Sequence, residues 1–138
     1  MFESLINHYA NNQFIAYSAG SKPTGSVHPL TIKTLEKNGI STLNLQSKSW
    51  DNFSNEELDI VITVCDNAAS ESCPIFLGNA NKIHIGFSDP AKFNGSQLEI
   101  EEEFQRVFEQ IKKMVLKISK IEILNQSPKE IAKIISNL

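Results

Sequence analysis

Apolar residues recur at helical spacing along much of this chain. Residues 2–9 carry them at positions 2, 5, 6 and 9, which predicts a short helix at the start. A second helix is expected to open at about Ser26 or Val27, because Pro29 suits a first helical turn and Gly39 suits the residue just past a helix end.

The longest apolar stripe with helical period spans residues 104–118. Glutamates precede it and lysines follow, the order of charge that a helix dipole favours. Further on, Ser127 and Glu130 form a capping box that predicts a last helix over about 127–137. The buried face of that helix is expected to consist of Ile131, Ile134 and Ile135.

Three shorter segments have the composition of strands. They are residues 14–18, residues 82–87 and the largely apolar run 59–65, which predicts a fully buried parallel strand. Because such strands alternate with helices, the sequence predicts an α/β fold with a mainly parallel sheet. The length fits a single domain over residues 1–138, with the 127–137 helix as an addition at its C-terminal end.

Composition and charge exclude several classes of protein. The formal net charge of -3 leaves no basic surface of the kind that binds nucleic acid. No stretch approaches the roughly 20 apolar residues that a membrane span needs, and the N-terminus lacks the basic start of a signal peptide. We therefore expect a cytoplasmic protein without nucleic-acid or membrane partners, whose two cysteines are reduced at rest.

Chemically usable side chains follow each predicted strand. Ser18 to Gly20 follow the first, Cys65 ends the second with Cys73 eight residues further on, and Asp89 follows the third. Because the carboxyl ends of parallel strands share one edge of a sheet, we expect these residues to lie on the same rim. A pair of thiols delivered there, beside a carboxylate, indicates redox chemistry.

Each of these residues also has an ordinary structural explanation. Cys65 at a strand end often serves as a small buried apolar residue, and Asp89 before Pro90 commonly starts a turn. Two cysteines are too few for a four-ligand zinc site without help from His28 or His84, so no metal or other cofactor is expected.

Six short motifs, in order along the chain, resemble those of a known family. The chain is similar to the arsenate reductases built on the low-molecular-weight tyrosine phosphatase fold, and the match runs from about residue 1 to 120. The motifs are Ser-Ala-Gly-Ser-Lys-Pro-Thr-Gly at 18–25, Val-His-Pro at 27–29, Ser-Lys-Ser at 47–49, Val-Ile-Thr-Val-Cys-Asp-Asn-Ala-Ala at 61–69, Cys-Pro at 73–74 and Phe-Ser-Asp-Pro-Ala at 87–91.

The resemblance implies a three-layer αβα fold with a parallel sheet and the reduction of arsenate to arsenite. In that family a cysteine from a Cys-x5-Arg loop attacks arsenic, and the aspartate of an Asp-Pro motif protonates the leaving oxygen. By motif, Asp89 corresponds to that acid. Cys65 and Cys73 correspond to the resolving thiols, with Cys65 the firmer match. Thioredoxin, glutaredoxin or a low-molecular-weight thiol is the implied reductant.

The chain departs from the family pattern at its N-terminal side. The resemblance places the first strand and the Cys-x5-Arg loop before the 2–9 helix, and neither lies within these residues. Arg106, the one arginine, has no cysteine six positions before it. We therefore expect the chain as given to be inactive or N-terminally truncated. The alternatives are a non-catalytic thiol redox or binding module on the same fold, and a relative of the low-molecular-weight tyrosine phosphatases.

Overall fold

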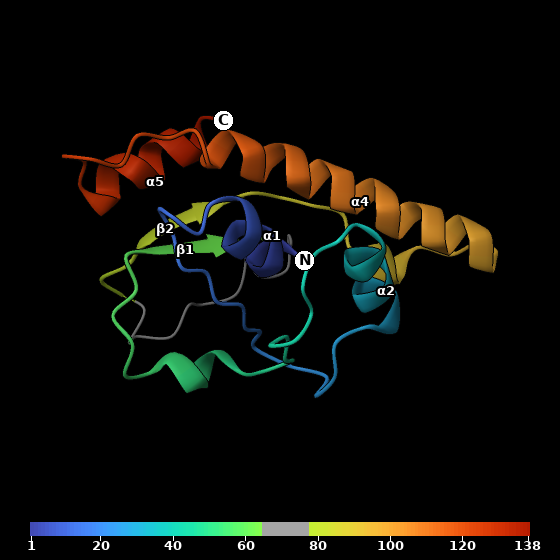
Figure 1. Ribbon diagram of the computed structural model, residues 1–138. Helices are drawn as coiled ribbons and strands as arrows, with labels where there is room; N and C mark the ends of the chain where they lie inside the picture. The colour runs from blue at the N-terminus through green and yellow to red at the C-terminus, as the bar shows by residue number, and fades with distance from the viewer. Residues whose placement is uncertain (65–77) are drawn as a thin grey trace.

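The computed structural model describes residues 1–64 and 78–138. In the described residues, helices stand before and after a pair of parallel strands, which is consistent with an α/β fold (Figure 1). The elements are α1 (Phe2–Tyr9), α2 (Pro29–Lys37), the 3₁₀ turn η1 (Trp50–Phe53), β1 (Ile60–Thr63), β2 (Asn81–His84), the 3₁₀ turn η3 (Pro90–Lys92), α4 (Gln97–Ile118) and α5 (Pro128–Ser136).

Helix α4 is the longest element, and its apolar stripe is buried as the sequence predicts. It begins at a capping box in which the Ser96 hydroxyl accepts from the Glu99 N–H while the Glu99 carboxylate accepts from the Ser96 N–H. Met114 is only partly covered. No helix in the described ranges is both long enough and apolar enough to cross a membrane. The buried residues of α4 are Phe104, Val107, Phe108, Ile111, Val115 and Ile118.

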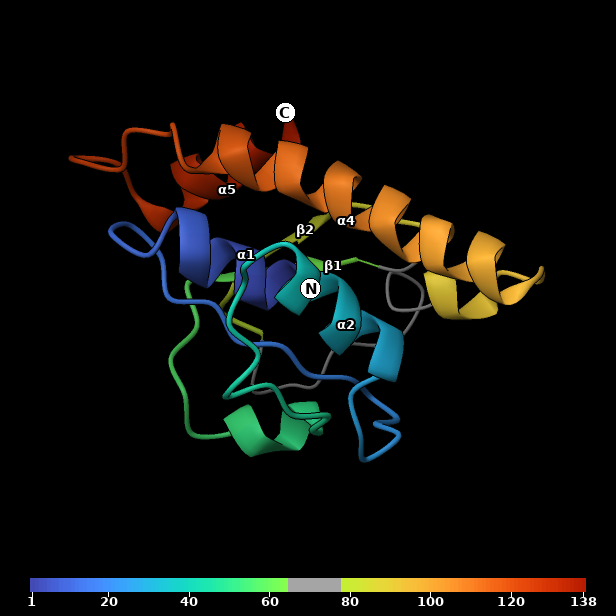
Figure 2. The same cartoon turned by 45° about the vertical axis from the view of Figure 1, so that its right-hand side comes forward.

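The other helices gather around α4 and the sheet. Both α1 and α2 pack against α4, while α5 packs against β2 and, less extensively, β1. Figures 1 and 2 both show the sheet between the α4–α5 layer and the η1 segment. From α1 and α2, Leu5 and Leu35 are fully buried in the resulting core. The layered α/β arrangement predicted from the sequence is therefore confirmed.

Two parallel strands form the sheet in the described part of the chain. Ile60 lies opposite Asn81 and Thr63 opposite His84, in continuous register. Backbone pairing continues past the strands, because the Ile85 N–H donates to the Thr63 carbonyl and the Phe87 N–H to the Val64 carbonyl, both at 2.9 Å. The predicted strand at 82–87 therefore begins one residue earlier and ends as a regular strand at His84.

The prediction that β1 is fully buried is wrong. All four residues of Ile60–Thr63 are partly exposed, although the segment is as apolar as a central strand. Within the described ranges β1 pairs with β2 alone. A strand with a single neighbour gains less cover than one flanked on both sides, which explains the difference between pattern and burial.

Residues 14–18 do not form the predicted strand. The segment is extended, with Phe14 and Ala16 packed against the core and Ile15 and Tyr17 pointing outward at 78% and 55% exposure. At Ala16 the backbone is paired with a side chain: the Asn7 amide accepts from the Ala16 N–H and donates to the Ala16 carbonyl, both at 2.8 Å. Its side chains alternate between the core and solvent, but in the described residues this segment has no strand partner.

Helix α5 begins as predicted, at a reciprocal capping box between Ser127 and Glu130. Its buried face differs by one position. Ile131 and Ile135 are buried, but the third buried residue is Ala132, while Ile134 is 36% exposed. Ala132 is 3% exposed on this helix, which packs against β2.

Replacing Phe108 with alanine should destabilise the protein strongly. Its ring is fully buried, and removal of a buried phenylalanine costs about 3–5 kcal/mol in lost transfer energy and cavity formation. Leu98→Ala is the matched control, because Leu98 lies on the same helix at 67% exposure and should change the free energy of unfolding by less than about 0.5 kcal/mol. Urea unfolding measures both. Equal effects would show that α4 does not anchor the core.

Candidate functional site

Asp89 lies in the loop that joins β2 to α4. Its backbone is extended, and its Oδ1 accepts from the Ala91 N–H at 3.0 Å, which caps η3. Pro90 occupies the first position of that turn, where its missing N–H leaves nothing unpaired. The side chain is exposed, and its second carboxylate oxygen has no hydrogen bond to any described residue. The turn-forming role expected of an Asp-Pro pair is therefore present, and one oxygen stays available for chemistry.

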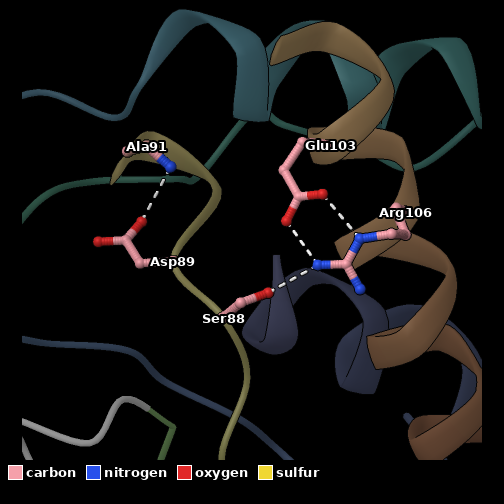
Figure 3. A network of polar contacts seen from close by, with 5 residues as sticks. All are labelled: Ser88, Asp89, Ala91, Glu103 and Arg106. Carbon is pink, nitrogen blue, oxygen red and sulfur yellow. Dashed lines mark hydrogen bonds and ion pairs between the residues drawn. The ribbon is translucent and has the colours of Figure 1, made fainter. Parts of the chain in front are cut away.

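The residue before Asp89 is tied to α4. The Arg106 guanidinium donates from one terminal nitrogen to the Ser88 Oγ at 2.9 Å. The same nitrogen donates to Glu103 Oε1 at 2.5 Å, and the Arg106 Nε donates to Glu103 Oε2 at 2.7 Å. Figure 3 shows this fork between α4 and the loop, with the Asp89 carboxylate on the far side of the loop from it. The loop is therefore linked to the helix at Ser88, and Asp89 does not take part in the ion pair.

The fork changes the protonation equilibrium of its acidic member. Hydrogen bonds from Arg106 lower the pKa of the Glu103 carboxyl from its ordinary 4.5, the positive charge of Arg106 adds to this, and burial opposes it. The same pairing raises the pKa of the Arg106 guanidinium. Both groups are therefore charged at neutral pH, and each compensates the other.

The two predicted thiols, Cys65 and Cys73, lie outside the described residues. What the structure describes is the residue before them: the Val64 carbonyl accepts from the Phe87 N–H at 2.9 Å. Val64 is one position before Cys65, and Phe87 is two positions before Asp89. The chain leading into Cys65 and the chain leading into Asp89 thus run side by side at the carboxyl ends of β1 and β2.

The third expected contributor, Ser18 to Gly20, takes a structural role. The Ser18 hydroxyl donates to the Glu3 carboxylate of α1. Gly20 forms an isolated parallel bridge with Ser49, in which its N–H donates to the Lys48 carbonyl at 3.0 Å. No hydrogen bond or ion pair in the described ranges joins these residues to Asp89.

The two histidines considered as metal ligands have other partners. His28 is the N-cap of α2: its Nδ1 accepts from the Leu30 N–H at 3.1 Å, and its ring stacks on Phe104 at 4.8 Å. His84 Nδ1 lies 2.9 Å from the Thr63 Oγ1. Across the part of the chain that the structure describes, no three His, Cys, Asp or Glu side chains gather as a metal site would require.

A surface hollow of about 300 Å³ lies elsewhere, between residues 25–27 and 45–47. Its walls are held together by a hydrogen bond from the Gly25 N–H to the Ser47 Oγ at 3.2 Å. Asp89 is not part of its lining. The hollow therefore adds nothing to the chemistry of the Asp89 loop.

Sequence reasoning missed the contribution of Arg106 and Ser88. It considered Arg106 only as a possible member of a Cys-x5-Arg loop and gave it no partner. The spacing of Glu103 and Arg106 is the i,i+3 separation of a helical ion pair and was a usable signal. The contact with Ser88 was not foreseeable, because it depends on where α4 crosses the loop.

Comparison with known proteins agrees with this geometry. The family model for low molecular weight phosphotyrosine protein phosphatases matches residues 1–130. An arsenate reductase of Halalkalibacterium halodurans is 33% identical over 115 residues, which cover 83% of this chain and 81% of that protein. An arsenate reductase of Bacillus subtilis is 32% identical over 80% of this chain and 78% of its own length. Arsenate reductase 2 of Staphylococcus saprophyticus is 36% identical over 80% and 79%.

The fold and the loop geometry define an α/β protein with an Asp-Pro turn after the last described strand of a parallel sheet. The match over residues 1–130 then gives its family. The chain belongs to the low molecular weight phosphotyrosine protein phosphatase family, and it is arsenate reductase-like by its similarity to relatives that carry that name.

The Glu103–Arg106 pair should make stability depend on pH in acid. A carboxyl whose pKa is lower in the folded state stabilises the fold above its unfolded value, and that contribution is lost as pH falls through the folded value. Glu103→Gln should therefore be less stable than wild type at neutral pH, and the deficit should shrink below about pH 4. Urea midpoints across this range test it. A deficit that stays constant with pH would contradict the pairing.

Proposed function

We propose that this chain carries the acid and the thiol relay of arsenate reduction. Asp89 is the proposed general acid, and Cys65 and Cys73 are the proposed resolving thiols. The observation that carries the proposal is the hydrogen bond between Val64 and Phe87, since it joins the segments that lead into Cys65 and Asp89. The relatives that bear the name arsenate reductase support the substrate.

The reaction needs one proton donor and two thiols. A thiolate attacks As(V) and displaces an oxygen, which leaves as water once an acid has protonated it. A second thiol then attacks the sulfur of the arsenic–thiol adduct, so that a disulfide forms and the As–S electron pair leaves with arsenic as arsenite. Two thiols are oxidised for each arsenic reduced. The exposed oxygen of Asp89 is suited to the proton transfer, because its other oxygen is already occupied by the Ala91 N–H.

The first attack also needs an anion site, and these 138 residues contain no Cys-x5-Arg loop to form one. An arsenate dianion is held by backbone N–H groups at a helix N-terminus and by a guanidinium, and the same positive field activates the attacking thiol. We therefore propose that the 138 residues by themselves do not turn over arsenate, and that such a loop completes the reaction. Repeated reduction of the disulfide by thioredoxin, glutaredoxin or a small thiol fits a cytoplasmic setting.

The assignment can be tested on a chain in which a strand and Cys-x5-Arg loop precede Met1. Asp89→Asn should slow the first attack by about 100-fold or more, since the acid is removed. Cys65→Ser should allow one attack and abolish multiple turnover. Asp51→Asn is the control, because Asp51 is an exposed aspartate of η1 that accepts from the Ser49 hydroxyl and lies in another 3₁₀ turn.

Arsenite release coupled to thioredoxin oxidation measures turnover, and hydrolysis of an aryl phosphate on the same protein distinguishes a phosphatase. Normal turnover of Cys65→Ser with Cys73 intact would show that Cys65 is not the resolving thiol. Arsenite production by the unextended 138-residue chain would overturn the need for the loop.

A second function, a thiol redox module, is favoured by the same absence of a Cys-x5-Arg loop. It requires only that Cys65 and Cys73 form a disulfide that a thioredoxin-like protein can reduce. Mild oxidant should then convert the 138-residue chain to a form with no free thiol, as shown by alkylation and mass measurement. The Cys73→Ser variant is the control and should keep one free thiol in the monomer. Two free thiols in the oxidised wild-type chain would exclude this function.

A further inference from the structure

The one arginine of the chain is held in a defined orientation. Its Nε and one terminal nitrogen both donate to the Glu103 carboxylate, which forms a two-point fork along one turn of α4. The Glu103 side chain is 13% exposed, whereas that of Arg106 is 49% exposed. The acidic partner is therefore anchored close to the helix surface, and it orients a guanidinium that reaches outward.

That guanidinium reaches the loop that carries Asp89. The terminal nitrogen shared with Glu103 also donates to the Ser88 Oγ at 2.9 Å (Figure 3). Ser88 is exposed and follows Phe87, whose ring packs against that of Phe2 at 5.9 Å. An apolar contact with α1 and a polar contact with α4 therefore hold two successive residues immediately before Asp89.

On the other side of Asp89 the restraint is weaker. The turn η3 spans only Pro90–Lys92, and its cap is the Asp89 carboxylate itself. A loop of this kind depends on contacts outside itself to keep one conformation, because a single exposed hydrogen bond is a weak restraint. Ser88 links the loop to the long helix through its hydrogen bond from Arg106, and it also has a hydrogen bond to the Glu103 carboxylate.

We propose that Arg106, oriented by Glu103, is a positioning residue that acts through Ser88 to hold the Asp89 carboxylate in place. This role rests on the proposed function of Asp89 as the acid. A general acid must be held to within about 0.5 Å of its productive position, and the rigid helix α4 is a better support than the loop. Lysine cannot replace the arginine, since an ammonium cannot form the planar fork to Glu103 while it also points at Ser88.

The alternative is an ordinary helical ion pair that happens to touch a serine. It predicts that loss of the pair affects α4 alone. The two can be distinguished at the Ala91 N–H, because this hydrogen donates to the Asp89 carboxylate and reports whether the loop stays in place. Arsenate is not needed for this measurement, so its result does not depend on whether Asp89 acts as an acid.

The experiment is solvent-exchange NMR of the Ala91 amide in the 138-residue chain. In Arg106→Lys and Ser88→Ala, exchange should be about 3- to 10-fold faster than in wild type, the change expected when one exposed hydrogen bond to the loop is lost. Ser88→Thr keeps the hydroxyl acceptor and should restore the wild-type rate. Glu101→Gln is the matched control, since it removes the Lys33–Glu101 ion pair from the same helix without touching the loop.

Wild-type exchange at Ala91 in both Arg106→Lys and Ser88→Ala would overturn the proposal, as would equal acceleration in Glu101→Gln. Amide shifts within α4 show whether each variant remains folded. Two results together would separate the two proposals: faster Ala91 exchange in Arg106→Lys, and full activity of Asp89→Asn in the protein that carries the added Cys-x5-Arg loop. They would count against Asp89 as the acid and still support Arg106 as the residue that positions the Asp89 loop.

Discussion

Burial of the apolar stripe of α4 is the constraint on which the rest of the structure depends. The helix presents two fully buried phenylalanines, Phe104 and Phe108, to a core that α1 and α2 complete from the other side. The described sheet is too small to organise such a core by itself, since it has two strands and no residue of β1 or β2 is fully buried. The packing of α1 and α2 against α4 therefore sets where these helices lie.

The Asp89 loop shows how this constraint extends to chemistry. The loop is located by what it touches: Ile85 is buried in the core, Phe87 packs on the ring of Phe2 of α1, and Ser88 contacts the guanidinium of Arg106 on α4. Both helices are held by the same core. A change inside that core therefore alters the placement of a carboxylate on the surface without any direct contact with it.

Elements whose stability is local could be predicted from the sequence, and elements that depend on a partner could not. The capping box at Ser127 and the stop at Gly39 involve only neighbouring residues, and both are present in the structure. The segment 14–18 has the alternation of a strand, yet a strand also needs a neighbour, and Asn7 supplies the hydrogen bonds instead. The apolar character of β1 overstated its burial for the same reason.

The same distinction applies to the candidate site. The turn at Asp89 follows from the Asp-Pro sequence, since the carboxylate and the N–H that it accepts are two residues apart. The Arg106–Ser88 contact joins residues 18 positions apart, and no local pattern announces it. The roles of Cys65 and Cys73 rest on motif resemblance and stay a prediction, because both residues lie outside the described ranges.

Arg106 also shows why the acid alone is not an arsenate site. It is the one guanidinium of the chain, and it lies near the proposed acid, so it invites assignment as the oxyanion ligand. However, its charge is already compensated by Glu103, and two of its donors are used in that fork. A dianion placed against it would meet the Glu103 carboxylate at close range, where like charges repel strongly. Arg106 is therefore suited to holding the loop, and the positive charge that binds arsenate has to come from another group.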